Sequence, residues 1–346
     1  MTSACALRGS TQPLANGYDT ALLDLDGVVY IGDHAVPHAA ESIEAAHAHG
    51  MRVAFVTNNA SRTPETVAQQ LIDLGIKASP DDVITSSMAV ARLLTEQLSP
   101  GALVLVVGGD GLRTAIEQAG FVVATSADDD PAAVVQGYTT QTGWAHLAEA
   151  TIAVNRGALW IAANVDATMP SPRGPVPGNG ALVGAVALAT GRHPVVAGKP
   201  EPPLHEEAVR RTGAQRPLVV GDRLDTDIEG AVRGSADSLL VLTGVTDARR
   251  LLAAQAHERP TYISRDLRGL MTAHPDVVLT AGGAVCRAFE VAYDGRVAQV
   301  FATGADGDDV DALRALACLT WSGAQWDALN GDSALFARLG LVDAAR

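Results

Sequence analysis

Two aspartates one residue apart, at the end of a short apolar run, constrain this chain more than any other feature. Asp24 and Asp26 follow the run Ala21-Leu22-Leu23, and Gly27 comes directly after them. Side chains alternate along a β-strand, so both carboxylates point the same way. Two acids this close repel each other unless a cation or a shared proton neutralises them. The pattern predicts a buried strand that ends in an acidic, cation-binding turn at Gly27, although taken alone it also fits an exposed turn with two solvated aspartates.

Three further polar motifs follow apolar, β-branched runs in the same way. They read VTNN at 56–59, GKP at 198–200 and GDRLDTD at 221–227. Apolar runs of this kind are typical of parallel strands buried on both faces, whose carboxyl ends form the crevice where open α/β sheets bind ligands. We therefore expect a hydroxyl group, an ammonium group and a second acidic cluster at the same sheet edge as Asp24 and Asp26.

Together and in this order, the four motifs resemble those of the haloacid dehalogenase superfamily. The resemblance implies an α/β fold with a doubly wound, Rossmann-like parallel sheet core and a phosphatase site that uses Mg²⁺, a hard cation that prefers oxygen ligands. It implies that Asp24 and Asp222 hold the metal through their side chains and Asp26 through its backbone carbonyl. It also implies that Asp24 attacks phosphorus to form an aspartyl-phosphate. Asp26 would protonate the leaving alkoxide and then deprotonate the hydrolytic water.

The remaining motif residues are expected to bind phosphate or to support the metal. The resemblance assigns Thr57, Asn58 and Lys199 to the phosphoryl oxygens, where hydrogen-bond donors and a positive charge are needed. It places Asp227 beside the metal site, where it positions either Lys199 or a metal-bound water, and both options stay open. Asp225 is interpreted instead as a first-turn acid that complements a helix dipole.

The segment between the second and third motifs is too long for a loop and alternates strands with helices. Strands are expected at 103–107, 133–136 and 158–162, and helices at 112–119, 144–154 and 181–190. Nothing in this segment repeats the motifs, so we expect an inserted α/β cap domain at 92–193. The catalytic core then comprises 1–91 and 194–258, and a small α+β C-terminal extension occupies 259–346.

A large cap after the second motif resembles one branch of the superfamily, whose members hydrolyse small phosphomonoesters such as phosphoglycolate, glycerol phosphate and pyridoxal phosphate. In the cap, Asn164 and Asp166 stand in the segment AANVD, where relatives typically read ATNPD. These two residues and Asn179, in the segment PGNG, are expected substrate contacts. For Asn179, a plain turn and helix cap is an equally good interpretation.

The leading prediction is a Mg²⁺-dependent phosphatase that hydrolyses glycerol 3-phosphate. A neutral polyol suits the cap carboxylate of Asp166 better than the second carboxylate of phosphoglycolate, which Asp166 would repel by about 1 kcal/mol or more at close range. Phosphoglycolate and pyridoxal phosphate are the alternative substrates. A phosphate-shifting mutase and a catalytically silent regulatory protein that binds a phosphorylated metabolite are the alternative functions.

The resemblance implies a small phosphorylated metabolite as the partner, and composition argues against other classes. The formal net charge of −14 argues against binding nucleic acid or an anionic membrane surface. The first twenty residues lack a basic segment followed by an apolar one, and the apolar runs are shorter than the roughly 20 residues of a membrane helix. We expect a cytoplasmic enzyme, and a homo-oligomer is possible.

The C-terminal extension carries its own secondary-structure signals but no catalytic cluster. Asp294-Gly295 separates two apolar runs at 287–293 and 297–303, which predicts a β-hairpin. A helix with Val310, Leu313 and Leu316 on one face follows. The extension could be a packing module, an oligomerisation surface or a vestigial acyltransferase-like piece. Since every motif acid precedes it, truncation near Arg259 is expected to spare the chemistry.

Overall fold

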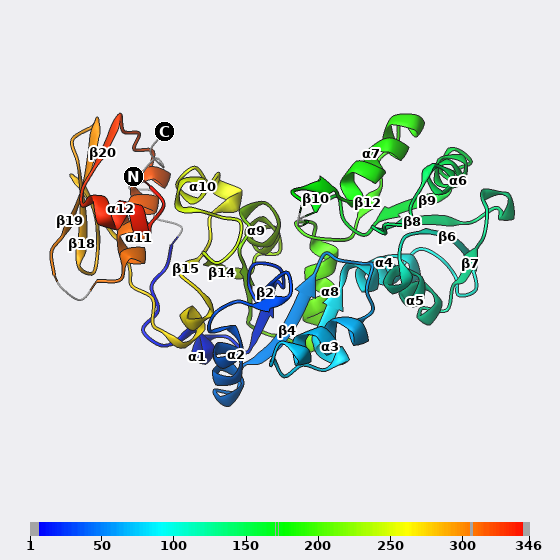
Figure 1. Cartoon of the computed structure of the whole chain (residues 1–346), viewed down its shortest axis with the longest axis horizontal. Coiled ribbons are helices and arrows are strands. Elements are labelled where there is room, and N and C mark those ends of the chain that lie inside the picture. Colours follow the sequence, from blue (N-terminus) through cyan, green and yellow to red (C-terminus); the bar gives the residue numbers. More distant parts are fainter. Residues whose placement is uncertain (1–6, 170, 172, 305–306, 342–346) are drawn as a thin grey trace. The chain divides into compact units, whose positions relative to one another are not determined.

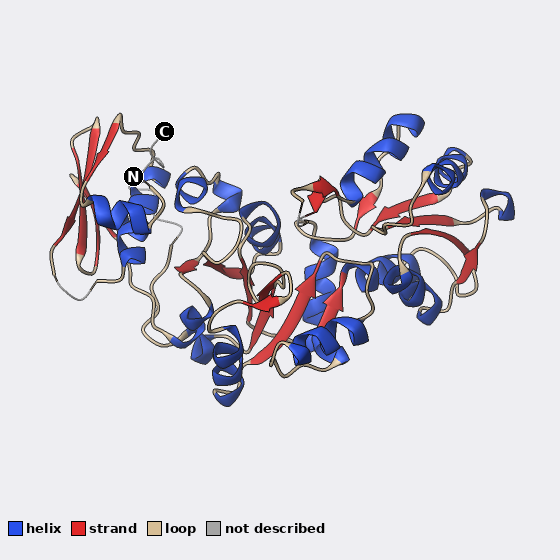
Figure 2. Cartoon of the chain, in the orientation of Figure 1, coloured by secondary structure: helices blue, strands red, loops and turns tan. Residues whose placement is uncertain are grey.

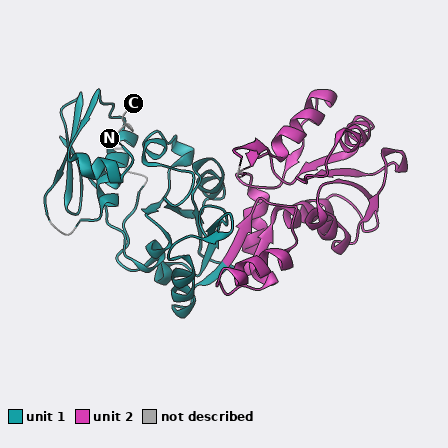
Figure 3. Ribbon diagram, viewed as in Figure 1, with its two compact units in different colours: residues 1–53, 214–346 teal, residues 54–213 magenta. Residues whose placement is uncertain are grey.

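The computed structural model describes residues 7–169, 171, 173–304 and 307–341, whose elements are labelled in Figure 1. The chain divides into two compact units (Figure 3). The first unit contains residues 1–53 and 214–346, and the second contains residues 54–213. Each unit is built on parallel strands flanked by helices (Figure 2), so the predicted α/β class is confirmed.

The first unit contains a parallel sheet with the strand order β15-β14-β13-β1. Every residue of β1 is buried, and so are four of the five residues in each of β13 and β14, which explains the continuous apolar runs in the sequence. The bounds are β1 Thr20–Leu23, β13 Pro217–Gly221, β14 Asp237–Val241 and β15 Tyr262–Ser264. The backbone N–H of Arg52 donates to the carbonyl of Asp19 at 2.8 Å, so β4 (Arg52–Thr57) starts beside the start of β1.

Short helices and a small hairpin surround this sheet. The hairpin of β2 (Tyr30–Ile31) and β3 (His34–Ala35) follows the first motif directly. The helical segments are α1 Leu14–Gly17, α2 Ala39–Ala48, η3 Leu224–Ile228, α9 Glu229–Arg233, α10 Ala248–Leu252, η4 Ala256–Glu258 and η5 Leu267–Met271. Among them, η3 is a single π-helical turn and carries the last acids of the fourth motif.

The extension forms a five-stranded sheet in the order β16-β17-β18-β19-β20, with α11 packed across β17 and β18. Its elements are β16 Val278–Thr280, β17 Gly283–Cys286, β18 Phe289–Tyr293, β19 Val297–Ala302, α11 Asp309–Trp321, β20 Ala328–Asn330 and α12 Ser333–Arg338. The hairpin predicted around Asp294-Gly295 is confirmed: β18 and β19 pair antiparallel, and the side chain of Asp294 accepts the N–H groups of Arg296 and Val297 at 2.8 Å each. The helix predicted after it is α11.

The extension and the four-stranded sheet share one hydrophobic cluster. Leu240, Leu251 and Ile263 of the sheet and its helices belong to the same cluster as the inner face of α11. The buried pair of Asp311 and Arg314 lies on that face, and the guanidinium of Arg314 also donates to the carbonyl of Ile263 on β15. The extension is therefore packed onto the first unit through a common core.

The second unit contains the end of β4 and a parallel sheet of its own, in the order β12-β9-β8-β6-β7. β4 pairs with β5 (Val83–Thr85), and α3 (Pro64–Asp73), α4 (Ser86–Thr95) and α8 (Pro202–Thr212) belong to this part, with η1 at Pro80–Asp82. The strands of the other sheet are β6 Leu103–Val107, β7 Val122–Ala124, β8 Ala133–Gln136, β9 Leu159–Ala162 and β12 Val195–Val196. The helices of this part are α5 Asp110–Gln118, η2 Ala127–Asp129, α6 Trp144–Asn155 and α7 Asn179–Thr190. A separate antiparallel pair is formed by β10 Thr168–Met169 and β11 Val176–Pro177. The cap elements predicted from the sequence are present here within a few residues of their expected bounds.

Two strands lie in a different part of the molecule from the one expected. The extension was expected to begin at residue 259, but β15 pairs in parallel with β14 in the core sheet, and the second strand is β12. The run before Lys199 was assigned to the core sheet, but β12 pairs in parallel with β9, with Val195 opposite Ile161. Lys199 therefore follows a strand of the second unit's own sheet. The run has only two ladder residues, and one of them is exposed, so its length and burial did not show which sheet it joins. No helix within residues 7–169, 171, 173–304 and 307–341 has the length and apolar content needed to span a membrane.

Candidate active site

Three carboxylates of the first unit converge at the carboxyl ends of two neighbouring strands. Asp24 follows β1 and Asp222 follows β13, while Asp227 lies in η3. One carboxylate oxygen from each residue lies within 4.8 Å of the others, and Asp222 and Asp227 are 0% and 1% exposed. Asp24 is partly exposed, and a divalent cation relieves the mutual repulsion of the three acids with the carboxylate oxygens that suit Mg²⁺. The residues present therefore fit a magnesium site.

The pairing of β1 with β13 brings the first and fourth motifs together. Leu23 lies opposite Val220, and the backbone N–H of Asp24 donates to the carbonyl of Val220 at 2.8 Å. Asp24 and Asp222 thus leave adjacent strands at nearly the same level. This arrangement follows from the parallel register, as the sequence predicted.

The carboxylate of Asp222 is held by the loop that follows β14. Its Oδ2 accepts the backbone N–H of Val245 at 2.6 Å, and its carbonyl oxygen accepts the N–H of Thr246 at 3.1 Å. Two glycines leave space for it: a Cβ on Gly27, where φ is +84°, would lie 2.5 Å from Oδ2, and one on Gly244 would lie 1.9 Å from it. The sequence analysis did not identify the 243–247 loop, whose only signal was its position after the predicted strand.

Asp227 is fixed by its own turn and Asp225 lies apart from the cluster. The Oδ2 of Asp227 accepts the backbone N–H of Arg223 at 3.2 Å, and a Cβ on Gly221 would lie 2.2 Å from the Cβ of Asp227. Asp225 instead forms an ion pair with the side chain of Arg223 at 2.8 Å and is 54% exposed. Only one of these two acids therefore contributes to the cluster.

Asp26 lies on the outer side of the turn. Its residue is exposed, whereas its neighbours Leu25 and Gly27 are buried. The Leu25 carbonyl accepts the N–H groups of Val29 and Tyr30 at 2.9 and 3.2 Å, which closes the turn around Asp26. Its carboxylate is not one of the three clustered ligand groups among the described residues. This placement leaves the side chain of Asp26 accessible for proton transfer.

In the second unit, Thr57 and Lys199 lie at the carboxyl end of β4. Both are nearly buried, at 4% and 3% exposed. The ammonium Nζ of Lys199 donates to the carbonyl of Val56 at 3.2 Å, and the hydroxyl of Thr57 accepts the N–H of Asn59 at 3.1 Å. An ammonium and a hydroxyl at one strand end are a donor set suited to the oxygens of an anion such as phosphate.

The side chain of Asn58 connects β4 with the cap. Its Oδ1 accepts the N–H of Lys199 at 2.8 Å, and its Nδ2 donates to the carbonyl of Lys199 at 3.1 Å and to both carboxylate oxygens of Asp166 at 3.3 Å. The amide of Asn58 is therefore engaged within the protein. Its backbone remains the part of the residue that could contact a phosphate.

The three predicted cap contacts belong to the same network. Asn164 donates to the Asn58 carbonyl at 2.7 Å and accepts the N–H of Asp166 at 3.2 Å. Asn179 is 1% exposed and donates to the carbonyls of Asn164 at 2.7 Å and Gln136 at 3.3 Å. Asn179 is the first residue of α7, whose N-cap is Gly178, and its side chain joins the start of this helix to β8 and to Asn164.

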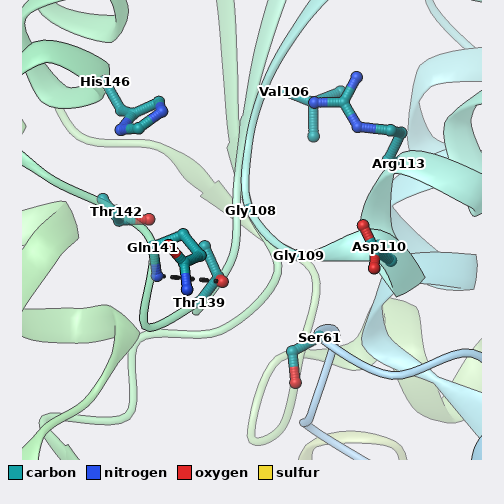
Figure 4. Close-up of a pocket in the computed structure, with 10 residues that line it drawn as sticks. All are labelled: Ser61, Val106, Gly108, Gly109, Asp110, Arg113, Thr139, Gln141, Thr142 and His146. Carbon is teal, nitrogen blue, oxygen red and sulfur yellow. Dashed lines mark hydrogen bonds between the residues drawn. The ribbon is translucent and has the colours of Figure 1, made fainter.

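A pocket of about 340 Å³ lies near this network, between the loops that follow β6 and β8 (Figure 4). The two strands are neighbours, and the chain leaves them toward opposite sides of the sheet, which is where α/β sheets bind ligands. Its polar lining includes Ser61, Arg113, Thr142 and His146. Ser61 donates to the side chain of Asn59 at 2.7 and 2.9 Å, so the pocket wall is joined to the 57–59 loop. The sequence analysis did not identify this pocket, because its residues come from four separate segments.

Comparison with known proteins places this site in a family. A haloacid dehalogenase-like hydrolase model matches residues 21–122, and a second HAD hydrolase-like model matches residues 196–270. The chain is 45% identical over 315 residues to D-glycerol 3-phosphate phosphatase of Mycobacterium tuberculosis. The alignment covers 89% of this chain and 87% of that protein. It is 38% identical over 252 residues to acid sugar phosphatase of Staphylococcus aureus, which covers 72% of this chain and 95% of that protein.

Solved structures give the same result. A crystal structure of glycerol phosphate phosphatase from Mycobacterium tuberculosis in complex with magnesium matches with a TM-score of 0.87 and 41% identity, over 96% of this chain and 100% of that one. A 4-nitrophenylphosphatase from Thermotoga maritima matches with a TM-score of 0.70 and 29% identity, over 75% of this chain and 98% of that one. Neither family model extends past residue 270. The acidic cluster, the parallel sheets and these matches show that the chain belongs to the haloacid dehalogenase-like hydrolase family, as its four motifs predicted.

Proposed function

We propose that this protein is a Mg²⁺-dependent phosphatase that hydrolyses a small phosphomonoester, with glycerol 3-phosphate as the preferred substrate. The observation that carries the proposal is the convergence of Asp24, Asp222 and Asp227 within 4.8 Å at the carboxyl ends of parallel strands. The similarity to a D-glycerol 3-phosphate phosphatase over 89% of the chain supports the substrate.

The side chains of Asp24 and Asp26 carry out the two chemical steps. Asp24 attacks phosphorus, and the bond to the leaving alkoxide breaks as Asp26 supplies its proton. Asp26 then takes a proton from the water that hydrolyses the aspartyl-phosphate, which releases orthophosphate and restores Asp24. Asp24, Asp222 and the carbonyl of Asp26 would hold Mg²⁺, which would supply positive charge to offset the charge of the phosphoryl oxygens.

The other motif residues bind phosphate or support the metal. Thr57 donates through its hydroxyl, Asn58 through its backbone N–H, and Lys199 contributes its positive charge. The position of Asp227 beside Asp24 and Asp222 favours the metal-bound water as its partner.

The cap determines which phosphate ester is accepted. We propose that residues 92–196 act as the cap on a core of 1–91 and 197–271, since β12 pairs with β9 and β15 pairs with β14. The carboxylate of Asp166 disfavours phosphoglycolate, while the polar pocket beside Ser61 offers hydroxyl and amide groups to a polyol. A sugar phosphate is the second candidate, because the pocket volume of about 340 Å³ exceeds what glycerol needs and an acid sugar phosphatase is 38% identical.

We further propose a cytoplasmic enzyme that acts on a free metabolite and does not bind nucleic acid. The net charge of −14 disfavours polyanionic partners. A small phosphorylated substrate favours the cytoplasm, because charged metabolites of this kind are retained there. We also propose that the protein forms a homo-oligomer, which size-exclusion chromatography with light scattering tests.

The test is orthophosphate release from a panel of esters, with Mg²⁺ and with EDTA. We expect release from glycerol 3-phosphate with the highest kcat/KM, and none after chelation. A higher kcat/KM for phosphoglycolate would contradict the substrate assignment, and phosphate that moves within the substrate without release would indicate a mutase. Binding without turnover would indicate a regulatory protein.

A further inference from the structure

The loop that holds Asp222 leads directly into α10, and the C-terminal extension packs against this helix. Val245 and Thr246 donate their backbone N–H groups to Asp222, at 2.6 and 3.1 Å. The next residue, Asp247, is the N-cap of α10 and accepts the N–H of Arg250 at 2.7 Å. The position of α10 therefore sets where the two donors lie.

The extension contacts α10 at three points. The indole N–H of Trp321, the last residue of α11, donates to the carbonyl of Leu251 at 3.3 Å. The guanidinium of Arg249 donates to the carbonyls of Gly340 and Leu341 at 3.4 and 3.1 Å. Trp321 is 7% exposed and Leu251 is 0% exposed, and both belong to the shared hydrophobic cluster.

The same cluster reaches the other acidic segment of the site. Leu224 and Ile228 begin and end η3, the turn that carries Asp227, and they are 1% and 0% exposed within the cluster. Both acids that follow β13 are thus attached to backbone that packs into the core shared with the extension. Backbone donors around a metal ligand fix its orientation, and their loss weakens metal binding.

We propose that the C-terminal extension is a support for the metal site and that Trp321 is a positioning residue for Asp222, acting through Leu251, α10 and the N–H of Val245. The inference rests on the proposed role of Asp222 as a metal ligand. It replaces the expectation that removal of the extension would spare the chemistry. It also explains how a segment with no catalytic cluster of its own serves the site.

The test compares two substitutions of buried aromatic residues in the full chain. Trp321→Leu removes the contact with α10. Phe289→Leu is the control: Phe289 lies on β18, is 6% exposed and belongs to the same hydrophobic cluster. Mg²⁺ affinity is measured by isothermal titration calorimetry, beside the thermal midpoint and kcat. We expect Trp321→Leu to weaken Mg²⁺ binding about tenfold, at the low end for a loss of support around a metal ligand. Phe289→Leu should lower the thermal midpoint but leave Mg²⁺ affinity at the wild-type value.

Two further variants make every outcome decisive. Trp321→Phe keeps the packing, so it should restore Mg²⁺ affinity to within about twofold of wild type despite the lost hydrogen bond. If Trp321→Leu does not fold, Arg249→Met serves as the test variant and Arg296→Met as its control. Arg249 donates to the carbonyl of Leu341, just after α12, whereas Arg296 forms an ion pair with Asp327 inside the extension. Equal loss of Mg²⁺ affinity in both members of a pair, or in neither, overturns the proposal.

Asp222→Asn in the same titration separates this inference from the proposed function. If Asp222→Asn weakens Mg²⁺ binding and the Trp321 variant does not, the inference alone is wrong. If Asp222→Asn itself leaves Mg²⁺ affinity unchanged, Asp222 is not a metal ligand and the proposed site fails.

Discussion

The acidic cluster of the first unit and the amide network of the second unit use polar side chains in opposite ways. Asp24, Asp222 and Asp227 bring their carboxylate oxygens close to one another, an arrangement that a cation stabilises. Asn58, Asn164 and Asn179 each donate an amide N–H to a backbone carbonyl and so connect separate segments of the protein. The comparison shows that clustered like charges indicate a ligand, whereas side-chain amides bonded to backbone carbonyls indicate scaffolding.

The largest effect should come from Asp24→Asn. The amide keeps the shape of the carboxylate but does not attack phosphorus, so kcat should fall by at least about 10³-fold. Phosphate release measures the loss, and thermal unfolding checks that the fold is intact. Asp225→Asn is the matched control, because its carboxylate pairs with Arg223 at the surface and its activity should stay near wild type. Substantial turnover by pure Asp24→Asn protein would refute the covalent mechanism.

The second-largest effect is expected from Gly244→Ala, which tests how closely the surrounding backbone packs against Asp222. A methyl group on Gly244 would lie 1.9 Å from the Oδ2 of Asp222, so Gly244→Ala should displace the carboxylate and raise the Mg²⁺ concentration for half-maximal activity by about tenfold or more. Gly17→Ala is the control, since nothing lies within 4 Å of its added methyl group. A normal Mg²⁺ requirement in Gly244→Ala would show that Asp222 tolerates movement.

A third prediction concerns the buried ammonium of the second unit. Lys199→Met should lower kcat/KM by about 10²-fold, because a charge that faces the phosphoryl group is lost. Lys77→Met, at the only other lysine of the chain and an exposed position, should behave as wild type. If Lys199→Met changed stability but left KM and kcat alone, its ammonium would serve the fold and phosphate binding would need another residue.

The smallest catalytic effect is expected in the amide network. Asn179→Ala removes the donor to the Asn164 carbonyl, while the Gln136 carbonyl keeps the backbone N–H of Ala163, and the loss should destabilise the protein by about 1–3 kcal/mol in denaturant unfolding. We expect kcat/KM for glycerol 3-phosphate to change less than threefold or so, on the order of half a kcal/mol. A large rise in KM with unchanged stability would support the prediction that Asn179 contacts the substrate, and would contradict the contrast between the two regions.

Most of the fold was predictable because its signals are local. The apolar runs at β1, β13 and β14 identified buried parallel strands, and Asp294-Gly295 identified the hairpin of the extension. One exception was β15, a three-residue strand assigned to the extension that pairs with β14 in the core sheet. The other was β12, because a run with two ladder residues carries no information about which sheet it joins. Domain assignment by motif order placed it with the core, whereas hydrogen bonding places it beside β9.

The sequence by itself determined which residue types stand at the strand ends, and so it identified the carboxylates, the lysine and the family. Strand alternation and parallel pairing bring such residues to one edge whatever the rest of the chain does. Only the tertiary structure decided what surrounds them. Val245 contacts Asp222 across 23 residues, Trp321 contacts Leu251 across 70, and Asn58 contacts Asp166 across 108. Hydrogen-bond partners at such separations depend on how whole elements pack, and no local pattern of polar and apolar residues encodes that.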